Sequence, residues 1–447
     1  MLKYCFIKTF LILLTMNINV PSVLTQPKIE FVEFNLENDL HVILHKDNTN
    51  PIVSVDIWYL VGSKDEDSNH TGFAHLFEHM MFQGSANVGK ADHFTYIQKA
   101  GGILNGSTNQ DRTNYFETVP SNQLELVLWL ESDRMSTLKV TTENFDNQRE
   151  VVKEEKRQRY DNVPYGSRFY NLFKDAYPGH PYKWIPIGSM EDLNNADVKY
   201  AQNFYRRFYA PNNAVLVIAG DIDYEKTREL VEKYFSHLGK APPKQNNYPG
   251  DRLFAGEKRD TILDNVQLPA IYMGYKLPPI TSHDIYALNL LSMVLGDGKS
   301  SRLYKRLVYE RMVSKSVNSF LWELELGTLF IITSVGMKEA ELNLLENLIN
   351  EEIEDVRNRP VTEKELEKVK NSLETDYINR LQTLLGRADL LARYWSYFKD
   401  TELINTDLEK YLNVTLQDIQ AAANKYLVQN NRVVLHYLPK EKNNTKK

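Results

Sequence analysis

The sequence almost lacks cysteine. Its single cysteine, Cys5, lies near the start of the 447-residue chain, within a segment that reads as a removable leader. A chain processed after this leader contains no thiol, which excludes disulfides and thiol catalysis. Stability must then come from packing, and an oxidising compartment is compatible with the sequence.

The sequence also lacks a strong net charge and a long hydrophobic run. Its 53 basic and 59 acidic residues leave a formal net charge of -6, so we expect no nucleic-acid partner. The apolar stretch Phe10–Met16 follows Lys3 and Lys8 and is too short to span a bilayer. This pattern predicts a signal peptide over residues 1–26, with an uncleaved membrane anchor as the alternative. We therefore expect an exported protein, periplasmic or secreted, without stable membrane insertion after processing.

What is present is an ordinary globular composition, with 42% hydrophobic residues, in a chain long enough for two or three domains. Two consecutive asparagines followed by an apolar strand occur twice in the sequence. Asn212-Asn213 and Asn430-Asn431 each follow a helical pattern and lead into such a strand, 218 positions apart. This repeat predicts two copies of one α+β domain. The predicted divisions are a metal-binding domain over 27–238, a linker over 239–258, a metal-free domain over 259–439 and a disordered tail over 440–447.

The segment His75-Leu76-Phe77-Glu78-His79 carries the chemistry. It lies in a predicted helix over 72–83, where residues four apart share a face, so His75 and His79 can bind one metal ion. The order H-x-x-E-H is the inverted zinc-peptidase signature, in which the glutamate exchanges protons instead of binding the metal. An exposed polar helix face is the alternative. The apolar neighbours of the motif disfavour it, because unpaired ionisable groups are costly to bury.

A catalytic zinc ion usually has three protein ligands, so a third must come from elsewhere. The predicted helix over 142–160 offers Glu150, Glu154 and Glu155. We expect Val151 and Val152 to face the core. Glu155 lies one turn after both valines, and this spacing favours Glu155 as the third ligand.

The segment from His75 to Ser85 resembles the active-site segment of the pitrilysin (M16) family of zinc peptidases, in particular the bacterial branch similar to the mitochondrial processing peptidase. The family's third ligand follows the second histidine by about 76 residues, which again selects Glu155. The resemblance implies one Zn²⁺ per chain, with ligands His75, His79 and Glu155, and Glu78 as the catalytic base. It also implies two tandem homologous domains, each a mostly antiparallel sheet backed by helices, that enclose a chamber.

The resemblance further implies that a peptide substrate adds as a strand beside Leu104, Asn105, Gly106, Ser107 and Thr108. Family members often use an arginine and a tyrosine of the metal-free half to reach the substrate. Arg311 matches the arginine, whereas Lys315 stands where the tyrosine is expected. Tyr304, Arg302 or a partner subunit could replace this tyrosine. A second departure is Gln148, where many relatives carry an acid.

These observations predict a zinc-dependent endopeptidase that cleaves peptides or unfolded segments. A non-catalytic, peptidase-like scaffold or core subunit is the alternative, and a metal-dependent esterase or phosphatase is a third reading. Phosphate chemistry usually employs two metals and more carboxylates, which disfavours the third reading. Because a two-domain chain is half of the largest family members, we expect a homodimer or a heterodimer with a metal-free paralogue.

Overall fold

The computed structural model describes residues 28–244, 248 and 256–440. The predicted signal peptide lies outside these residues, as does the predicted tail after residue 440, and only part of the predicted linker is described. Within the described residues, no helix has the length and apolar character needed to cross a membrane.

The first half of the chain forms a six-stranded sheet in the order β1-β2-β6-β3-β5-β4. Its strands are β1 (Val32–Asn35), β2 (His41–Lys46), β3 (Ile52–Tyr59), β4 (Ile103–Thr108), β5 (Thr113–Pro120) and β6 (Ala214–Gly220). Its helices are α1 (Phe73–Met80), α2 (Asp92–Lys99), α3 (Leu124–Thr137), α4 (Thr142–Lys156), α5 (Arg168–Ala176), α6 (Met190–Asn195), α7 (Val198–Phe208) and α8 (Tyr224–Phe235).

The second half forms a five-stranded sheet in the order β7-β11-β8-β10-β9. Its strands are β7 (Lys258–Asp264), β8 (Ala270–Leu277), β9 (Ser314–Trp322), β10 (Thr328–Gly336) and β11 (Arg432–Pro439). Its α-helices are α9 (Asp284–Gly296), α10 (Leu342–Asn358), α11 (Glu363–Leu381), α12 (Leu384–Phe398), α13 (Leu403–Leu412) and α14 (Leu416–Tyr426), and a π-helical segment covers Tyr304–Glu310.

Apart from the additional strand β1, the two sheets share one topology, which confirms the predicted α+β class with two sheets backed by helices. β2 and β6 pair in parallel, as do β7 and β11, and the pairs that follow toward β4 and β9 are antiparallel in both sheets. The second asparagine of each repeated pair, Asn213 and Asn431, has the same role in both halves. The Asn213 side-chain amide donates to the Phe208 carbonyl at 2.8 Å, and that of Asn431 donates to the Tyr426 carbonyl at 2.9 Å. Each bond satisfies a carbonyl at the end of a helix.

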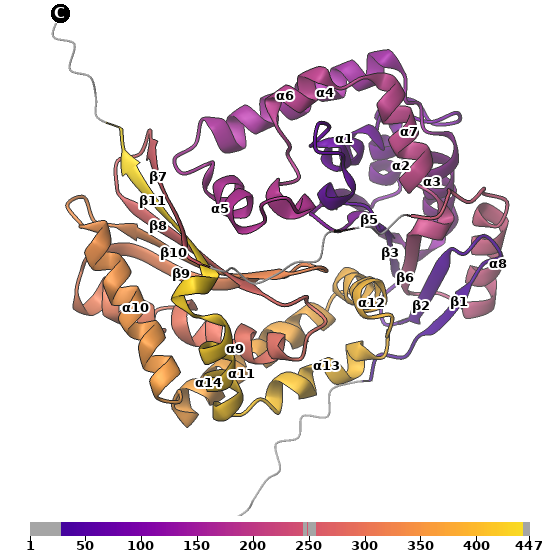
Figure 1. Ribbon diagram of the computed structural model, residues 1–447. Helices are drawn as coiled ribbons and strands as arrows, with labels where there is room; N and C mark the ends of the chain where they lie inside the picture. The colour runs from indigo at the N-terminus through magenta and orange to yellow at the C-terminus, as the bar shows by residue number, and fades with distance from the viewer. Residues whose placement is uncertain (1–27, 245–247, 249–255, 441–447) are drawn as a thin grey trace, which may run out of the picture.

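The two halves exchange a helix. α5 of the first half contacts β8 and β11 of the second sheet, whereas α12 of the second half contacts β3 and β6 of the first sheet (Figure 1). The range 259–439, predicted as one domain, therefore contributes a helix to the core of the other half. This exchange buries apolar surface from both halves together, so we expect the halves to fold as one cooperative unit.

The strand β6 is the apolar strand predicted after Asn212-Asn213, and both of its faces are covered. Leu216 and Ile218 pack into the core on one face of the first sheet, while Val215 and Val217 pack with residues of α12 on the other face. A strand that is covered on both faces needs apolar side chains at successive positions.

Candidate active site

The helix α1 is positioned by its apolar side and by its first turn. Phe73, Leu76, Phe77 and Met80 are buried, which leaves His75, Glu78 and His79 on the remaining side. The carboxylate of Glu66, itself buried, accepts hydrogen bonds from the Gly72 and Ala74 amides at 2.9 and 2.8 Å. An acceptor at a helix N-terminus satisfies amides that have no partner within the helix.

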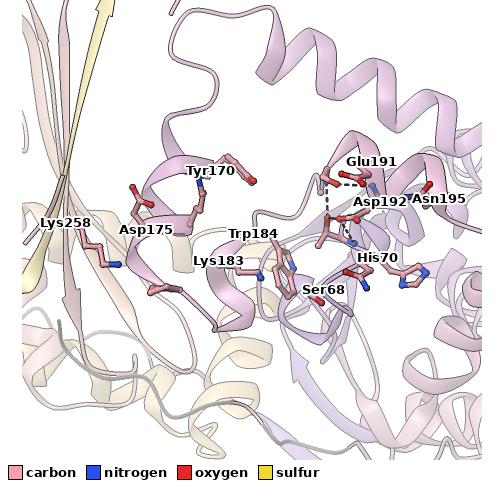
Figure 2. Close-up of a pocket in the computed structure, with 16 residues that line it drawn as sticks. Ser68, His70, Tyr170, Asp175, Lys183, Trp184, Glu191, Asp192, Asn195 and Lys258 are labelled. Atoms are coloured by element: carbon pink, nitrogen blue, oxygen red, sulfur yellow. Dashed lines mark hydrogen bonds between the residues drawn. The ribbon is translucent and has the colours of Figure 1, made fainter. Parts of the chain in front are cut away.

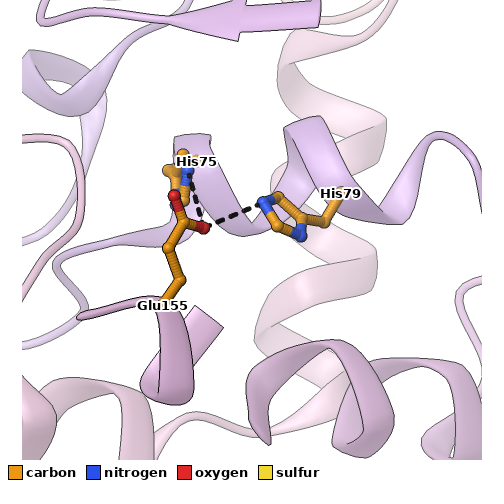
Figure 3. Close-up of side chains that lie close together, drawn as sticks. All are labelled: His75, His79 and Glu155. Atoms are coloured by element: carbon orange, nitrogen blue, oxygen red, sulfur yellow. Dashed lines mark ion pairs between the residues drawn. The ribbon is translucent and has the colours of Figure 1, made fainter. Parts of the chain in front are cut away.

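Three potential metal ligands meet between α1 and the C-terminal end of α4. The Glu155 carboxylate oxygen lies 3.6 Å from His75 Nε2 and 3.4 Å from His79 Nε2, and the three ligand atoms lie within 4.8 Å of one another (Figure 3). Tetrahedral zinc with bonds of about 2.1 Å places its ligands about 3.4 Å apart. The geometry and chemistry of these two imidazoles and one carboxylate therefore fit a zinc ion.

The other two candidate glutamates, Glu150 and Glu154, point elsewhere. Glu150 pairs with Lys153 at 2.8 Å and Glu154 pairs with Arg157 at 3.0 Å, both at the surface. The expectation that Val151 faces the core is wrong, because its exposure is 44%. The buried stripe of α4 instead runs through Phe145, Gln148 and Val152, and Glu155 continues it at the next helical turn.

The local environment favours the protonation states that metal ligands need. Burial, followed by the neighbouring His79, lowers the pKa of His75 to about 4. The hydrogen bond with His79 is the largest of the influences that lower the pKa of Glu155. A neutral imidazole and an ionised carboxylate are the forms that bind metal ions.

The carboxyl group of Glu78 lies beside the edge strand β4. Burial raises its pKa, and a hydrogen bond with Thr108 opposes this effect. A Cβ atom on Gly106 would lie 3.2 Å from Glu78 Cγ, so the strand passes very close to this side chain. In the described part of the sheet, β4 pairs with β5 alone, which leaves its other side available to an added strand. Of the predicted substrate-binding residues Leu104–Thr108, Gly106, Ser107 and Thr108 line one cavity with His75, Glu78 and Glu155, whereas Leu104 and Asn105 do not line it.

A cavity of about 380 Å³ adjoins this site. It is lined by His75, Glu78, Gly106, Ser107, Thr108, Asn109, Gln110, Glu155, Arg159, Tyr160, Phe169, Ile185, Pro186, Ile187 and Trp322. It shares Tyr160 and Ile185 with a second cavity of about 390 Å³. The second cavity shares Tyr170 with a third, of about 880 Å³, which extends toward Lys258 of the second half (Figure 2). The cavity at the metal site is thus the first of three cavities that are linked by shared lining residues.

The structure does not bring the predicted residues of the second half to this cavity. Arg311 and Lys315 are exposed and do not line it. Arg302 instead forms a two-bond ion pair with Glu365, at 2.7 and 2.8 Å. Tyr304 also does not line the cavity, and the side-chain amide of Gln148 donates to Asn147 at 2.9 Å. Sequence reasoning missed Trp322, which lies at the end of β9 and gives no local signal of its role.

A second group of possible metal ligands is an ion-pair network. His93, Glu117 and Glu131 bring their ligand atoms within 4.8 Å in the core. The guanidinium of Arg134 already fills this group, with bonds of 3.3 Å to Glu117 and 2.9 Å to Glu131. An arginine neutralises the carboxylates without a metal ion.

The described chain thus combines two similarly connected sheets, exchanged helices and a histidine–glutamate site beside an edge strand. Residues 41–189 match the family "Insulinase (Peptidase family M16)", and residues 195–373 match "Peptidase M16 inactive domain". The matches cover more than half of the chain, which therefore belongs to the M16 peptidase family.

Relatives and solved structures agree with this assignment. The chain is 32% identical over 409 residues to the zinc protease PqqE of Helicobacter pylori, covering 90% of each chain. It is 27% identical over 386 residues to an uncharacterized zinc protease of Mycobacterium leprae, covering 84% of each. The crystal structure of a Helicobacter pylori protease superposes with a TM-score of 0.88 at 29% identity, covering 92% of this chain and 100% of that one.

Proposed function

We propose that this protein is an exported zinc-dependent endopeptidase that hydrolyses peptides or unfolded segments, with one zinc ion per chain. The observation that carries the proposal is the convergence of His75, His79 and Glu155 within 4.8 Å, next to Glu78 and the free edge of β4. The M16 relatives named as zinc proteases support the same chemistry.

His75, His79 and Glu155 would hold the zinc ion, which supplies Lewis acidity toward water and toward the scissile carbonyl. The edge of β4 would bind the substrate backbone by strand addition, so that recognition depends little on side chains away from the bond that is cut. Glu78 would take a proton from the attacking water and then deliver it to the leaving amine.

The test is peptide cleavage by the purified protein and its Glu78→Gln variant, read as product masses from a peptide library. We expect wild-type cleavage that a chelator abolishes and added zinc restores. The variant should retain zinc and lose at least about 100-fold in rate, the usual contribution of a positioned proton-transfer group. Wild-type rates in Glu78→Gln, or chelator-insensitive cleavage, would overturn the proposal. Bound zinc without any cleavage would favour the peptidase-like scaffold instead.

Export and assembly are further parts of this proposal. The pattern of Lys3, Lys8 and Phe10–Met16 supports export. The periplasmic protease PqqL of Escherichia coli, which shares the fold at 18% identity, makes a periplasmic location reasonable. N-terminal sequencing of exported protein should begin near residue 27. We also propose a homodimer or a heterodimer with a metal-free paralogue. Sedimentation should show a dimer either of the chain alone or of the chain with a metal-free paralogue, and a monomer that binds no paralogue would contradict this assembly.

A further inference from the structure

A cavity of about 440 Å³ lies on the face of the first sheet that is opposite to the catalytic base. On the edge strand β4, a Cβ atom on Gly106 would point toward Glu78. β4 pairs with β5 without a bulge from Ile103 to Thr108, and successive side chains of a strand point to opposite faces. Ile103, three residues before Gly106, therefore faces away from Glu78, and its side chain lines this cavity about 10 Å along the strand.

Three neighbouring strands form the floor of the cavity. Ile103 of β4 pairs with Thr118 of β5, which in turn pairs with Ser54 of β3, and all three residues line the cavity. The hydroxyls of Ser54 and Thr118 form a hydrogen bond with each other at 2.8 Å. Because each hydroxyl already has a partner, the floor does not require a polar group from a ligand.

The start of α12 forms another wall, so the second half of the chain contributes to this cavity. Leu384 and Leu385 are half-buried and line it, and Ile52 of β3 adds a further apolar side chain. The lining thus brings apolar side chains of both halves together at one edge of the first sheet. Such a surface favours an apolar ligand group.

The charged side chains at this cavity are already paired within the protein. Arg387 and Asp47 both line it, and the Arg387 guanidinium donates to the Asp47 carboxylate at 2.5 Å. The same guanidinium donates to the Leu381 carbonyl at 2.7 Å. These bonds leave the apolar side chains as the main surface that can select a ligand.

The exposure of Ile103 indicates that something covers it during function. Its side chain is 66% exposed on an edge strand, where proteins usually avoid large apolar groups because they invite pairing with other chains. In the described part of the sheet, the free side of β4 is the side to which a substrate strand would add. A peptide at this edge is therefore the occupant that the position of Ile103 favours.

Strand addition determines which part of the peptide reaches the cavity. Residues directly opposite each other in paired strands have Cβ atoms about 4.5–5.5 Å apart. When the scissile bond lies beside Glu78 and Gly106, the peptide residue opposite Ile103 is the third from the residue opposite Gly106. Its side chain points away from the zinc and lies against Ile103 at the mouth of the cavity.

We propose that the cavity lined by Ile103, Leu384 and Leu385 is a distal subsite that binds a large apolar side chain of the peptide substrate, about three residues from the scissile bond. This inference rests on the proposed peptidase function and adds a substrate class to it. The subsite lies on the sheet face away from the zinc, so its contribution depends on the distal side chain and not on the chemistry of Glu78.

The experiment uses the zinc-loaded full chain and a peptide that wild type cuts at a single bond, mapped by product masses. Each peptide residue beyond the two that flank this bond is replaced in turn by phenylalanine or serine. For each peptide, kcat/KM is measured in wild type, Ile103→Thr and Leu385→Ser. Leu263→Thr is the matched control, because Leu263 is an aliphatic residue on the edge strand β7 that is 58% exposed and does not line the cavity.

We expect wild type and Leu263→Thr to prefer phenylalanine over serine by about tenfold at one distal position, as apolar pockets commonly do. Ile103→Thr and Leu385→Ser should each reduce this ratio at least about threefold, the effect of removing about one buried methylene from the contact, and should change the serine peptide little. Ile103→Thr keeps a β-branched residue at an exposed position, so it carries the test if Leu385→Ser does not fold, judged by circular dichroism and zinc content.

Three results would overturn the inference while the proposed function stands. They are a wild type that distinguishes phenylalanine from serine at no distal position, a ratio that stays unchanged in folded Ile103→Thr, and an equal loss of the ratio in Leu263→Thr. No cleavage of any peptide by zinc-loaded wild type would overturn the proposed function itself, and this inference with it.

Discussion

Gly106 provides a sharp test of how closely β4 approaches the catalytic base. A Cβ atom at this position would lie 3.2 Å from Glu78 Cγ, 3.2 Å from Tyr115 Cδ1 and 3.3 Å from the Asn114 carbonyl oxygen. Carbon atoms pack comfortably at about 3.5–4.0 Å, so Gly106→Ala requires Glu78 to move by about 0.3–0.8 Å. Tyr115 is fully buried and cannot move away as easily.

This displacement should affect catalysis more than stability. A misplacement of about 1 Å can reduce a rate about 100-fold, so we expect kcat to fall about 10- to 100-fold in Gly106→Ala. Overpacking should reduce the free energy of unfolding by about 1–3 kcal/mol, partly offset by about 0.4–1 kcal/mol because alanine restricts the unfolded chain. Zinc content should not change, because Gly106 does not contact the three ligands.

The assay is steady-state cleavage of one peptide, together with urea unfolding and zinc analysis. Gly239→Ala is the matched control, because a Cβ atom there meets nothing within 4 Å. This control should keep wild-type kcat. A Gly106→Ala protein with wild-type kcat would refute the close approach of β4 to Glu78.

The remaining predictions concern two charged residues, Arg302 and Lys64, whose ion pairs stabilise the fold. Arg302→Gln should leave kcat unchanged, because Arg302 does not line the metal cavity, and should cost about 1.5–3 kcal/mol of unfolding free energy by removing its charged bonds to Glu365. The hydrogen bonds from Arg302 are the largest cause of the low pKa of Glu365, which is about 2 compared with its usual 4.5. Their stabilisation is therefore complete above about pH 4.5 and is lost as the pH falls toward 2, so unfolding of the variant should depend less on pH in this window. If the unfolding free energy of the variant and of the wild type depended equally on pH, the stabilising role of the Arg302–Glu365 bonds would be contradicted. Lys64→Met should destabilise the protein by about 3 kcal/mol in urea unfolding, because it leaves the buried Asp111 carboxylate without its 2.9 Å partner. Unchanged stability would show that the hydrogen bonds that Asp111 accepts from the Tyr182 hydroxyl and the Glu325 amide suffice.

The features that were predicted correctly from the sequence depend on the spacing of residues that are close together in the chain. Two histidines four residues apart must share a helix face, and Glu155 lies on the buried stripe of its helix whether or not Val151 does. The repeated asparagines indicated two similar sheets because each ends a helix in the same way. The designation of Val151 as a core residue failed because a helical stripe through Val152 leaves its immediate neighbour on the flank.

Contacts between distant segments could not be predicted in this way. The helical pattern of α12 shows an apolar face but not which sheet will cover it, so its exchange between the halves was missed. Trp322 follows His79 by 243 positions and reaches the metal cavity only because the hairpin after β9 binds the turn after β4. Arg302, one of the three candidates for the role of the missing tyrosine, does not line the cavity for a related reason, because the carboxylates that bind it come from other helices.

Zinc content per chain tests the central claim most directly. The account predicts about one zinc ion per wild-type chain and a loss of that zinc in Glu155→Gln. It predicts full retention in Glu154→Gln, because the neighbouring Glu154 pairs with Arg157 at the surface. Equal zinc content in the two variants, or a wild-type chain without zinc after purification with added metal, would contradict it.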